Sequence, residues 1–283
     1  MADAVHLVEL APEGAPSVLD IDRLQERRAS LWLGKALPPE PPVGAPVLSG
    51  SKVTTFLPGI VAEFSFRDRP VRFFVKNVAD VIQSSHANGR FYESDTLPTM
   101  ERFLVPGGVF LDVGANVGNH AIFAKMFGNQ REVITLEPNP EAITLLRLNV
   151  ILNQLDIDLS HLGVGLSDQD AAAVAVVPHN NLGAARMEAR AGGGLKLVMG
   201  DSLFAGRHID FIKVDVEGLE PAVLRGLART IANSQPTMFI EIDTHNRQTV
   251  SEWIQANAYE VAHAFPQYPR TQNVIVRPKT ASV

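Results

Sequence analysis

Apolar runs of strand length alternate with segments of helix length along the last two thirds of the chain. From Pro106 onward, the runs "VFLDVG", "EVITLE", "IDFIKVDV" and "TMFIEID" are each followed by a segment long enough for a helix. Near-continuous apolar strands separated by helices are typical of a parallel sheet covered on both faces. The last two runs, "YEVAHAF" and "QNVIVRP", flank a proline-containing turn and predict an antiparallel pair. The pattern predicts an α/β, doubly wound domain over residues 106–283.

The first 105 residues follow a different pattern. Residues 21–33 can form a short amphipathic helix, and the prolines that cluster in residues 37–46 favour an extended connector. After them, β-rich segments on either side of "RDRP" indicate a hairpin. We therefore expect an N-terminal helix and linker over residues 1–50 and an accessory β/α region over residues 51–105.

Composition narrows the class of protein. The chain is 46% hydrophobic and 20% charged, which is ordinary for a globular protein with a sizeable core. A net charge of −6 gives no electrostatic reason to expect nucleic acid as a partner. The absence of cysteine excludes a disulfide framework and thiolate chemistry. With no signal-peptide pattern and no apolar run long enough to span a bilayer, the sequence favours a cytoplasmic protein. A homodimer is compatible with these properties.

The stretch "FLDVGANVGNH", residues 110–120, predicts a buried strand, a glycine turn and a helix. Gly114 and Gly118 lie at the carboxyl end of the strand, where α/β sheets bind ligands and where glycine lets the backbone approach them. The dinucleotide fingerprint G-x-G-x-x-G does not fit, because Asn116 and Asn119 stand at its second and third glycine positions. The P-loop pattern fails as well, since no Gly-Lys-Ser/Thr ending is present.

Two acidic residues near this turn indicate which nucleotide would bind. Glu137, at the end of the next strand, can accept hydrogen bonds from both ribose hydroxyls. The carboxylate of Asp112 would repel phosphate and attract a cation. A ligand with a ribose, no phosphate and a positive centre fits, and S-adenosylmethionine (SAM) has these properties. The simpler alternative is a glycine turn inside another kind of α/β protein.

A series of ordered motifs resembles the FkbM-family methyltransferases, within the class I SAM-dependent fold. The resemblance covers residues 91–277 and rests on "FYE", "FLDVGANVGNH", "LEPNPEAITLLRLNVILN", "GLSD", "NNLG", "DSL" and "IDFIKVDVEGLEPAVLRGL". It implies a Rossmann-like, mostly parallel seven-stranded sheet with an antiparallel last strand. It also implies methylation of a hydroxyl oxygen, commonly on a sugar of a polysaccharide, glycolipid or secondary metabolite.

The resemblance also implies roles for individual residues. Its cofactor-loop and ribose positions correspond to Asp112, Gly114, Asn116, Gly118 and Glu137, and the segment that closes over the cofactor corresponds to Tyr92 and Glu93. Asp168 falls where class I enzymes often contact adenine. Asn180 and Asn181 lie in a loop suited to hydrogen-bonding a polyhydroxylated acceptor.

Methyl transfer is an in-line displacement in which the sulfonium supplies the leaving group, so the protein contributes positioning, exclusion of water and a proton acceptor. In "IDFIKVDVEG", Lys213, Asp215 and Glu217 alternate along a strand and share one face until it ends. We interpret Asp215 as the base or a metal ligand, with Lys213 and Glu217 orienting it or the substrate. Alternatively, the three residues form a salt-bridge cluster that holds the strand–helix turn.

The segment "FIEIDTHN" places Glu241, Asp243 and His245 at the same edge of the sheet. With Asp215, Glu241 could bind Mg²⁺ through oxygen atoms, although the sequence does not favour a metal. His245 is an alternative base, because histidine titrates near neutral pH. Two further functions stay open. A nicotinamide-dependent oxidoreductase is disfavoured by Asn116 and Asn119, and a non-catalytic SAM-binding module is disfavoured by the complete K-x-D-x-E-G cluster.

Overall fold

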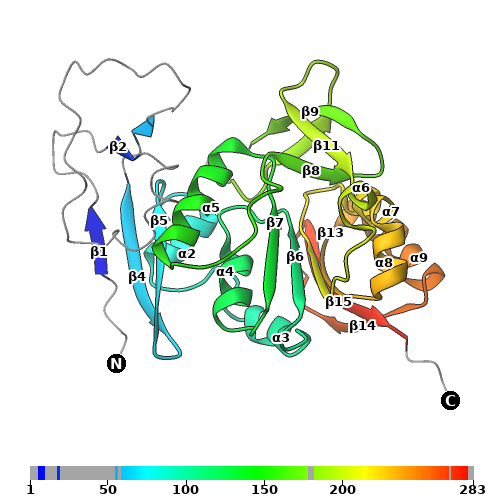
Figure 1. Ribbon diagram of the computed structural model, residues 1–283, viewed down its shortest axis with the longest axis horizontal. Helices are drawn as coiled ribbons and strands as arrows, with labels where there is room; N and C mark the ends of the chain where they lie inside the picture. The colour runs from blue at the N-terminus through cyan, green and yellow to red at the C-terminus, as the bar shows by residue number, and fades with distance from the viewer. Residues whose placement is uncertain are drawn as a thin grey trace. The chain divides into compact units, whose positions relative to one another are not determined.

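The computed structural model describes residues 59–177, 182–267 and 269–279, together with the backbone of three short strands, β1 (His6–Glu9), β2 (Val18–Leu19) and β3 (Thr55–Phe56). Figure 1 shows the elements. The helix expected over residues 21–33 and the proline-rich connector lie outside the described residues, as do Asn180 and Asn181.

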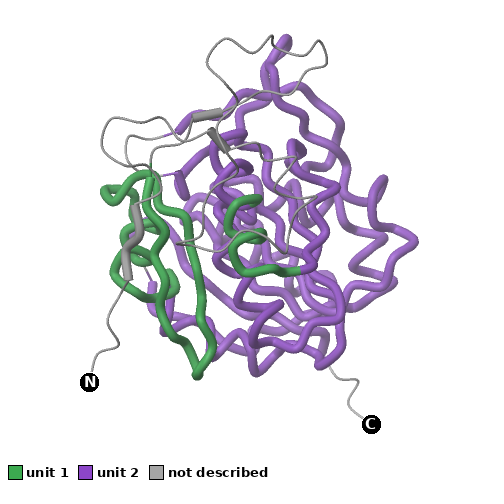
Figure 2. The backbone as a smooth tube through the Cα atoms, turned by 60° about the vertical axis from the view of Figure 1, so that its left-hand side comes forward, with its two compact units in different colours: residues 1–92, 147–155 green, residues 93–146, 156–283 purple. Residues whose placement is uncertain are grey.

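The chain divides into two compact units, which are coloured separately in Figure 2. The smaller unit comprises residues 1–92 and 147–155, and the larger one comprises residues 93–146 and 156–283. The larger unit therefore begins earlier in the chain than residue 106, where the sequence pattern changes. Helix α5 (Pro140–Leu152) is shared, since its first half belongs to the larger unit and its second half to the smaller one.

A six-stranded sheet forms the centre of the larger unit, with the order β14–β15–β13–β12–β6–β7 (Figure 1). Its parallel strands are β6 (Val109–Val113), β7 (Glu132–Leu136), β12 (Phe211–Val214) and β13 (Thr237–Asp243). The last strand, β15 (Thr271–Pro278), pairs antiparallel with both β13 and β14 (Tyr259–Ala264). The parallel strands and the antiparallel final pair are confirmed.

The prediction of seven strands is wrong. The strand after α5, β8 (Val164–Ser167), pairs with β11 (Leu195–Met199) in a separate four-stranded sheet that also contains β9 (Ala171–Val176) and β10 (Arg186–Ala189). The outer edge of β7 is instead bonded by Asp158, whose N–H donates to the Val133 carbonyl at 2.8 Å and whose carbonyl accepts from the Thr135 N–H at 3.0 Å. These bonds occupy the edge at which a seventh strand would pair.

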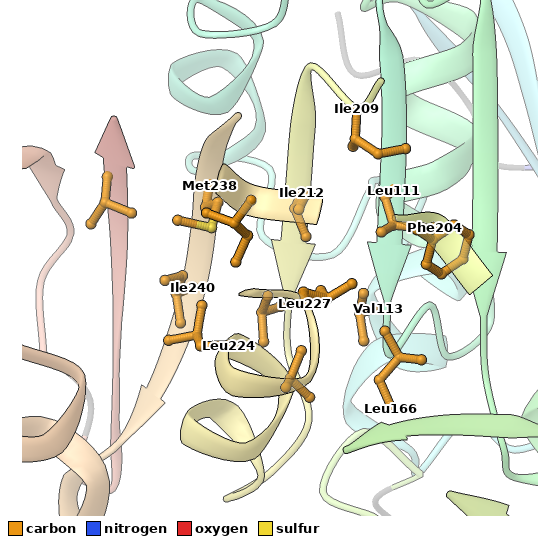
Figure 3. Close-up of a cluster of buried hydrophobic side chains, with 14 of the residues drawn as sticks. Leu111, Val113, Leu166, Phe204, Ile209, Ile212, Leu224, Leu227, Met238 and Ile240 are labelled. Atoms are coloured by element: carbon orange, nitrogen blue, oxygen red, sulfur yellow. The ribbon is translucent and has the colours of Figure 1, made fainter. Parts of the chain in front are cut away.

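Helices cover both faces of the six-stranded sheet. One face contacts α4 (Asn119–Met126), and the opposite face packs against α7 (Glu220–Gly226) and α9 (Arg247–Ala256), with α6 (Gly200–Phe204) and α8 (Ala228–Ser234) beside them. Figure 3 shows the core on the second face, where Leu111, Ile212 and Ile240 from three strands meet Leu224 and Leu227. Each of these side chains is fully buried. Short α3 (Leu97–Glu101) and the 3-10 helix η1 (Thr244–Asn246) complete the unit.

The smaller unit contains the predicted hairpin. Strands β4 (Ile60–Phe66) and β5 (Arg69–Val75) pair antiparallel and are joined by Arg67 and Asp68, both at positive φ, as a tight two-residue hairpin requires. β1 pairs with β4, and α2 (Val81–Ala87) packs on β5. Asn149, in the second half of α5, accepts a hydrogen bond from the Phe74 N–H at 2.7 Å. The second half of α5 is thus tied to the hairpin of its own unit.

Candidate functional site

The glycine turn between β6 and α4 has the conformation expected from its residues. Gly114, Asn116 and Gly118 have φ values of 82°, 49° and 91°. A Cβ atom at Gly114 would lie 1.8 Å from the carbonyl oxygen of Asp215, so glycine lets the ends of β6 and β12 approach one another. The N–H groups of Gly114 and Ala115 both donate to the Leu136 carbonyl, at 3.0 and 2.9 Å. These two donors are therefore not available to a phosphate.

Glu137 lies at the end of β7, as the sequence predicts, and its side chain is held rigidly. One carboxylate oxygen accepts the Asn116 N–H and the other accepts the Asn139 N–H, each at 2.8 Å. Burial raises the pKa of Glu137 to about 7, and the two backbone hydrogen bonds limit the rise. A carboxylate has about four lone-pair positions. With two in use, Glu137 can still accept two hydrogen bonds from a diol.

These residues line a cleft in the larger unit. Its volume is about 560 Å³, including the part that is open to solvent. Four polar side chains line it, from Asn116, Glu137, Asp215 and Glu217. Its apolar wall is formed by Leu136, Leu166, Leu182, Met187, Leu197 and Leu219. An apolar cleft with a few convergent polar groups is typical of a small-molecule site. One of the polar atoms, Oδ1 of Asn116, is buried and has no hydrogen-bond partner among the described residues.

A buried ion-pair cluster lies beside the cleft, at the ends of β6 and β12. Lys213 Nζ is 3.3 Å from Asp112 Oδ1 and 3.1 Å from Asp215 Oδ2, and it donates a hydrogen bond to the Gly114 carbonyl at 3.0 Å. Burial alone would lower the pKa of Lys213, but the two carboxylates outweigh it and hold the pKa above its ordinary value. The alternative salt-bridge cluster of Lys213, Asp215 and Glu217 is present only in part, because Asp112 and not Glu217 is the second carboxylate paired with Lys213. Asp112 is fully buried in it and does not line the cleft, so its predicted contact with the cofactor stays a prediction.

Three carboxylates converge beside the cleft, and two of them, Asp215 and Glu217, line it. Asp215, Glu217 and Glu241 each place an oxygen atom within 4.8 Å of the others, which is a geometry that could hold a cation. One of them, Asp215, is already paired with an ammonium group, since Lys213 Nζ is 3.1 Å from it. Burial, followed by the charge of Asp215, raises the pKa of Glu217 to about 7 and that of Glu241 to about 9. These values reduce the negative charge of the group at neutral pH.

Hydrogen bonds to neighbouring residues hold the turn that carries Glu217. Glu217 and Gly218 have φ values of 51° and 109°, so the chain turns sharply between β12 and α7. Glu220 accepts hydrogen bonds from the Gly218 N–H and from Asn246 Nδ2, each at 2.6 Å, and Asn246 also donates to the Gly218 carbonyl. Gly218 stands in the turn, and Pro221 stands in the first turn of α7.

Glu93 lies in a second buried polar cluster of the larger unit. Its carboxylate is 3.2 Å from His120 Nε2 and accepts a hydrogen bond from Asn273 Nδ2 at 2.9 Å. Burial would raise the pKa of Glu93, but the bond to His120 and its charge lower it overall. Glu93 does not line the cleft described above, and Tyr92 belongs to the smaller unit. Their predicted closure over the cofactor stays a prediction.

Asp243, to which the sequence prediction gave no role, holds His245 at the edge of the sheet. Asp243 Oδ1 lies 2.8 Å from His245 Nδ1 and accepts the His245 N–H at 3.0 Å, while Asp243 Oδ2 lies 3.2 Å from Arg186 on β10. These backbone and ring contacts hold the pKa of Asp243 below its usual value. The ring of His245 is 88% exposed and does not line the cleft.

Asp168, the predicted adenine contact, is engaged elsewhere. Its carboxylate pairs with Arg225 at 2.8 Å, and it is not among the residues that line the cleft. The sequence prediction also missed Arg186 and Asn273. Asn273 lies directly opposite Glu241 in the antiparallel register of β13 and β15, and Arg186 reaches Asp243 from the second sheet. Alternation along the last strand could have indicated Asn273 only if the register had been known.

The chain is similar to known methyltransferases. The family model described as "Methyltransferase FkbM domain" matches residues 112–261. No curated protein matches the chain. The similar solved structures include a FkbM methyltransferase from Methylobacillus flagellatus KT, with 15% identity, 69% of this chain and 52% of that chain covered, and a TM-score of 0.42.

Two other similar structures are of proteins that are named as tRNA methyltransferases. A tRNA methyltransferase of B. subtilis has 13% identity, 65% coverage of each chain and a TM-score of 0.42. A Streptococcus pneumoniae candidate tRNA methyltransferase, solved in complex with S-adenosyl-L-methionine, has 14% identity, covers 67% of this chain and 75% of that chain, and has a TM-score of 0.45. The chain spans about half to two thirds of the length of the first two structures.

The fold is α/β, with a glycine turn at the carboxyl end of β6. The family model covers more than half of the chain, and the chain belongs to the FkbM methyltransferase domain family. Within the described residues, no helix combines the length and the apolar character that a membrane span requires.

Proposed function

We propose that the protein transfers the methyl group of SAM to a hydroxyl oxygen, on a sugar of a glycan, glycolipid or secondary metabolite. The observation that carries this proposal is the joint presence of two features in one cleft. Glu137 is held in position to accept a diol, and Asp215 and Glu217 offer proton acceptors in the same cleft, with Glu241 beside them. A hydroxyl is a weak acid, so its methylation gains more from a nearby base than methylation of a thiol would.

The residues of the cleft fit the cofactor. Glu137 would bind the ribose hydroxyls, and the leucine-rich wall would pack on adenine. The unpartnered Oδ1 of Asn116 offers an acceptor to the ammonium group of the methionine tail. When bound, SAM supplies an electrophilic methyl group and a neutral thioether leaving group. The protein would then align the acceptor hydroxyl, exclude water and take up the hydroxyl proton.

We also propose that the reaction proceeds without a divalent cation. The Lys213 ammonium offsets one of the two negative charges of Asp112 and Asp215, and Glu217 and Glu241 have pKa values of about 7 and about 9. The remaining charge suits a monocation such as a sulfonium better than Mg²⁺, which prefers several ionised oxygen ligands.

Cofactor binding is tested by calorimetry with sinefungin and S-adenosylhomocysteine. We expect binding to the native protein and a loss of at least about tenfold in affinity for Glu137→Ala, because the cleft loses its diol acceptor. A matched control, Glu188→Ala, changes an exposed glutamate on β10 and should bind normally. A thermal shift with NAD in place of S-adenosylhomocysteine would instead favour an oxidoreductase.

The acceptor class is tested by transfer of a labelled methyl group to monosaccharides, methyl glycosides, glycolipids, small phenols and total tRNA. Labelling of a sugar hydroxyl, with and without EDTA, is the expected result. Labelling of tRNA alone would contradict the acceptor class, and loss of labelling in EDTA would contradict the metal-free reaction. Binding of sinefungin without labelling of any acceptor would indicate a non-catalytic SAM-binding module.

A further inference from the structure

The three neighbouring carboxylates, Asp215, Glu217 and Glu241, differ in their partners. Asp215 is paired with Lys213 at 3.1 Å, and Glu241 is hydrogen-bonded by the side chain of Thr271. Glu217 has neither an ion pair nor a hydrogen bond to its side chain among residues 59–177, 182–267 and 269–279. It lines the same cleft as Glu137 and Asn116. Glu217 is thus the member of the group whose carboxylate is available to a ligand.

The backbone holds Glu217 in this half-buried position within the cleft. Its φ of 51° is in the left-handed region, which a residue with a Cβ enters only at a cost. The conformation is fixed because Glu220 and Asn246 bind the backbone of the next residue, Gly218. The side chain of Glu217 is therefore placed by the turn itself and not by a bond to its own carboxylate.

The charges that face Glu217 make it the better base of the group. The negative charge of Asp215 acts on it most strongly, Arg186 opposes this effect, and Glu220 and Asp243 add smaller negative contributions. Burial and these carboxylates raise the pKa of Glu217 to about 7, near the value at which a general base works best at neutral pH. In contrast, the carboxylate of Asp215 is already engaged in an ion pair with the ammonium of Lys213 at 3.1 Å.

We propose that Glu217, and not Asp215, accepts the proton of the acceptor hydroxyl. This inference rests on the proposed function and names the residue that performs its proton transfer. The hydroxyl oxygen forms a bond to the methyl carbon as the carbon–sulfur bond breaks, and that electron pair remains on sulfur as the neutral thioether. The hydroxyl proton passes to a carboxylate oxygen of Glu217 and is then released to water. Asp215, which is held by its ion pair with Lys213, positions the acceptor.

The experiment compares Glu217→Gln, Asp215→Asn and His245→Gln with Glu188→Gln, a surface control on β10. The acceptor is the hydroxyl compound that the native enzyme labels in the methyl-transfer screen. For Glu217→Gln we expect kcat to fall by about 10²–10⁴-fold, the loss typical of a general base, with S-adenosylhomocysteine affinity unchanged within about twofold. Glu188→Gln should retain native activity.

The pH profile separates a base from a residue with a structural role. The acidic limb of kcat/KM should disappear in Glu217→Gln and persist in Asp215→Asn and His245→Gln, even if those variants are slower. Full activity of Glu217→Gln, or an acidic limb that disappears with Asp215 or His245, would overturn the assignment. If the native enzyme binds sinefungin but labels no hydroxyl, the proposed function fails and this inference fails with it.

Discussion

At the scale of single residues, the fold buries carboxyl groups in and beside the cleft, which disfavours their ionised form. Burial raises the pKa of Glu137 and Glu217 to about 7 and that of Glu241 to about 9. A carboxyl group whose pKa is higher in the folded state than in the unfolded state favours folding while it is protonated. This contribution is complete below the unfolded pKa, near 4.5, and is lost as the pH rises through the folded value.

Glu241 should therefore make the cofactor-free protein less stable as the pH rises from about 4.5 to about 9. Glu241→Gln keeps the shape of the side chain and removes the titration. We expect its melting temperature to decline less steeply than that of the native protein between pH 5 and pH 9, measured by scanning fluorimetry. The surface variant Glu188→Gln should follow the native curve. Parallel curves for Glu241→Gln and the native protein would contradict this prediction.

Residue types and spacing were enough to predict the chemical composition of the site, but not the partners of each side chain. Glu137 and the ion pair of Lys213 with Asp215 are where the strand pattern places them. Asp112 lies beside Lys213 in the register of β6 and β12, and its carboxylate is paired with the Lys213 ammonium. Alternation along a strand specifies a face, and only the register between strands decides which group on that face pairs with which.

At the scale of the elements, two close backbone approaches bring the parts of the cleft together. Gly114 allows the end of β6 to contact the end of β12, and Gly226 allows α7 to contact β8. A Cβ atom at Gly226 would lie 1.9 Å from the carbonyl oxygen of Ser167 and 2.7 Å from its carbonyl carbon. Because these are backbone atoms, they cannot move aside as a flexible side chain would.

Gly226→Ala should therefore lower the free energy of unfolding by at least about 1–3 kcal/mol, the usual cost of overpacking. Gly206→Ala is the matched control, because its Cβ would meet no atom within 4 Å, and it should change stability by less than about 0.5 kcal/mol. Urea denaturation of both variants provides the comparison. Equal midpoints for the two variants would show that α7 moves away from β8 without a measurable cost.

Most of the elements could be predicted because their signals are local. Apolar runs identify the parallel strands, and "RDRP" identifies the β4–β5 hairpin. The pairing of β8 could not be predicted in this way. Its partner β11 lies about thirty residues further along the chain, and the edge of β7 is bonded by a loop residue, Asp158. Such competition for a sheet edge depends on distant backbone groups that no local pattern reports.

At the scale of the whole molecule, the division into units does not follow the linear order of the chain. The sequence pattern suggests a cut near residue 105, but residues 147–155 belong to the N-terminal unit. Asn149 and Asn153 bind the backbone of β5 within that unit, at Phe74 and Arg72. These hydrogen bonds join positions about 75–80 residues apart, so neither composition nor periodicity could indicate them.

The left-handed backbone of Glu217 sets stability against activity. Glycine adopts this conformation without the cost of about 1–2 kcal/mol that a residue with a Cβ incurs. Glu217→Gly should therefore melt at a higher temperature than the native protein and lose about 10²–10⁴-fold in kcat, whereas an unchanged or lower melting temperature would contradict this. Screening variants of this enzyme by heat resistance alone would enrich glycine at position 217 and select against catalysis.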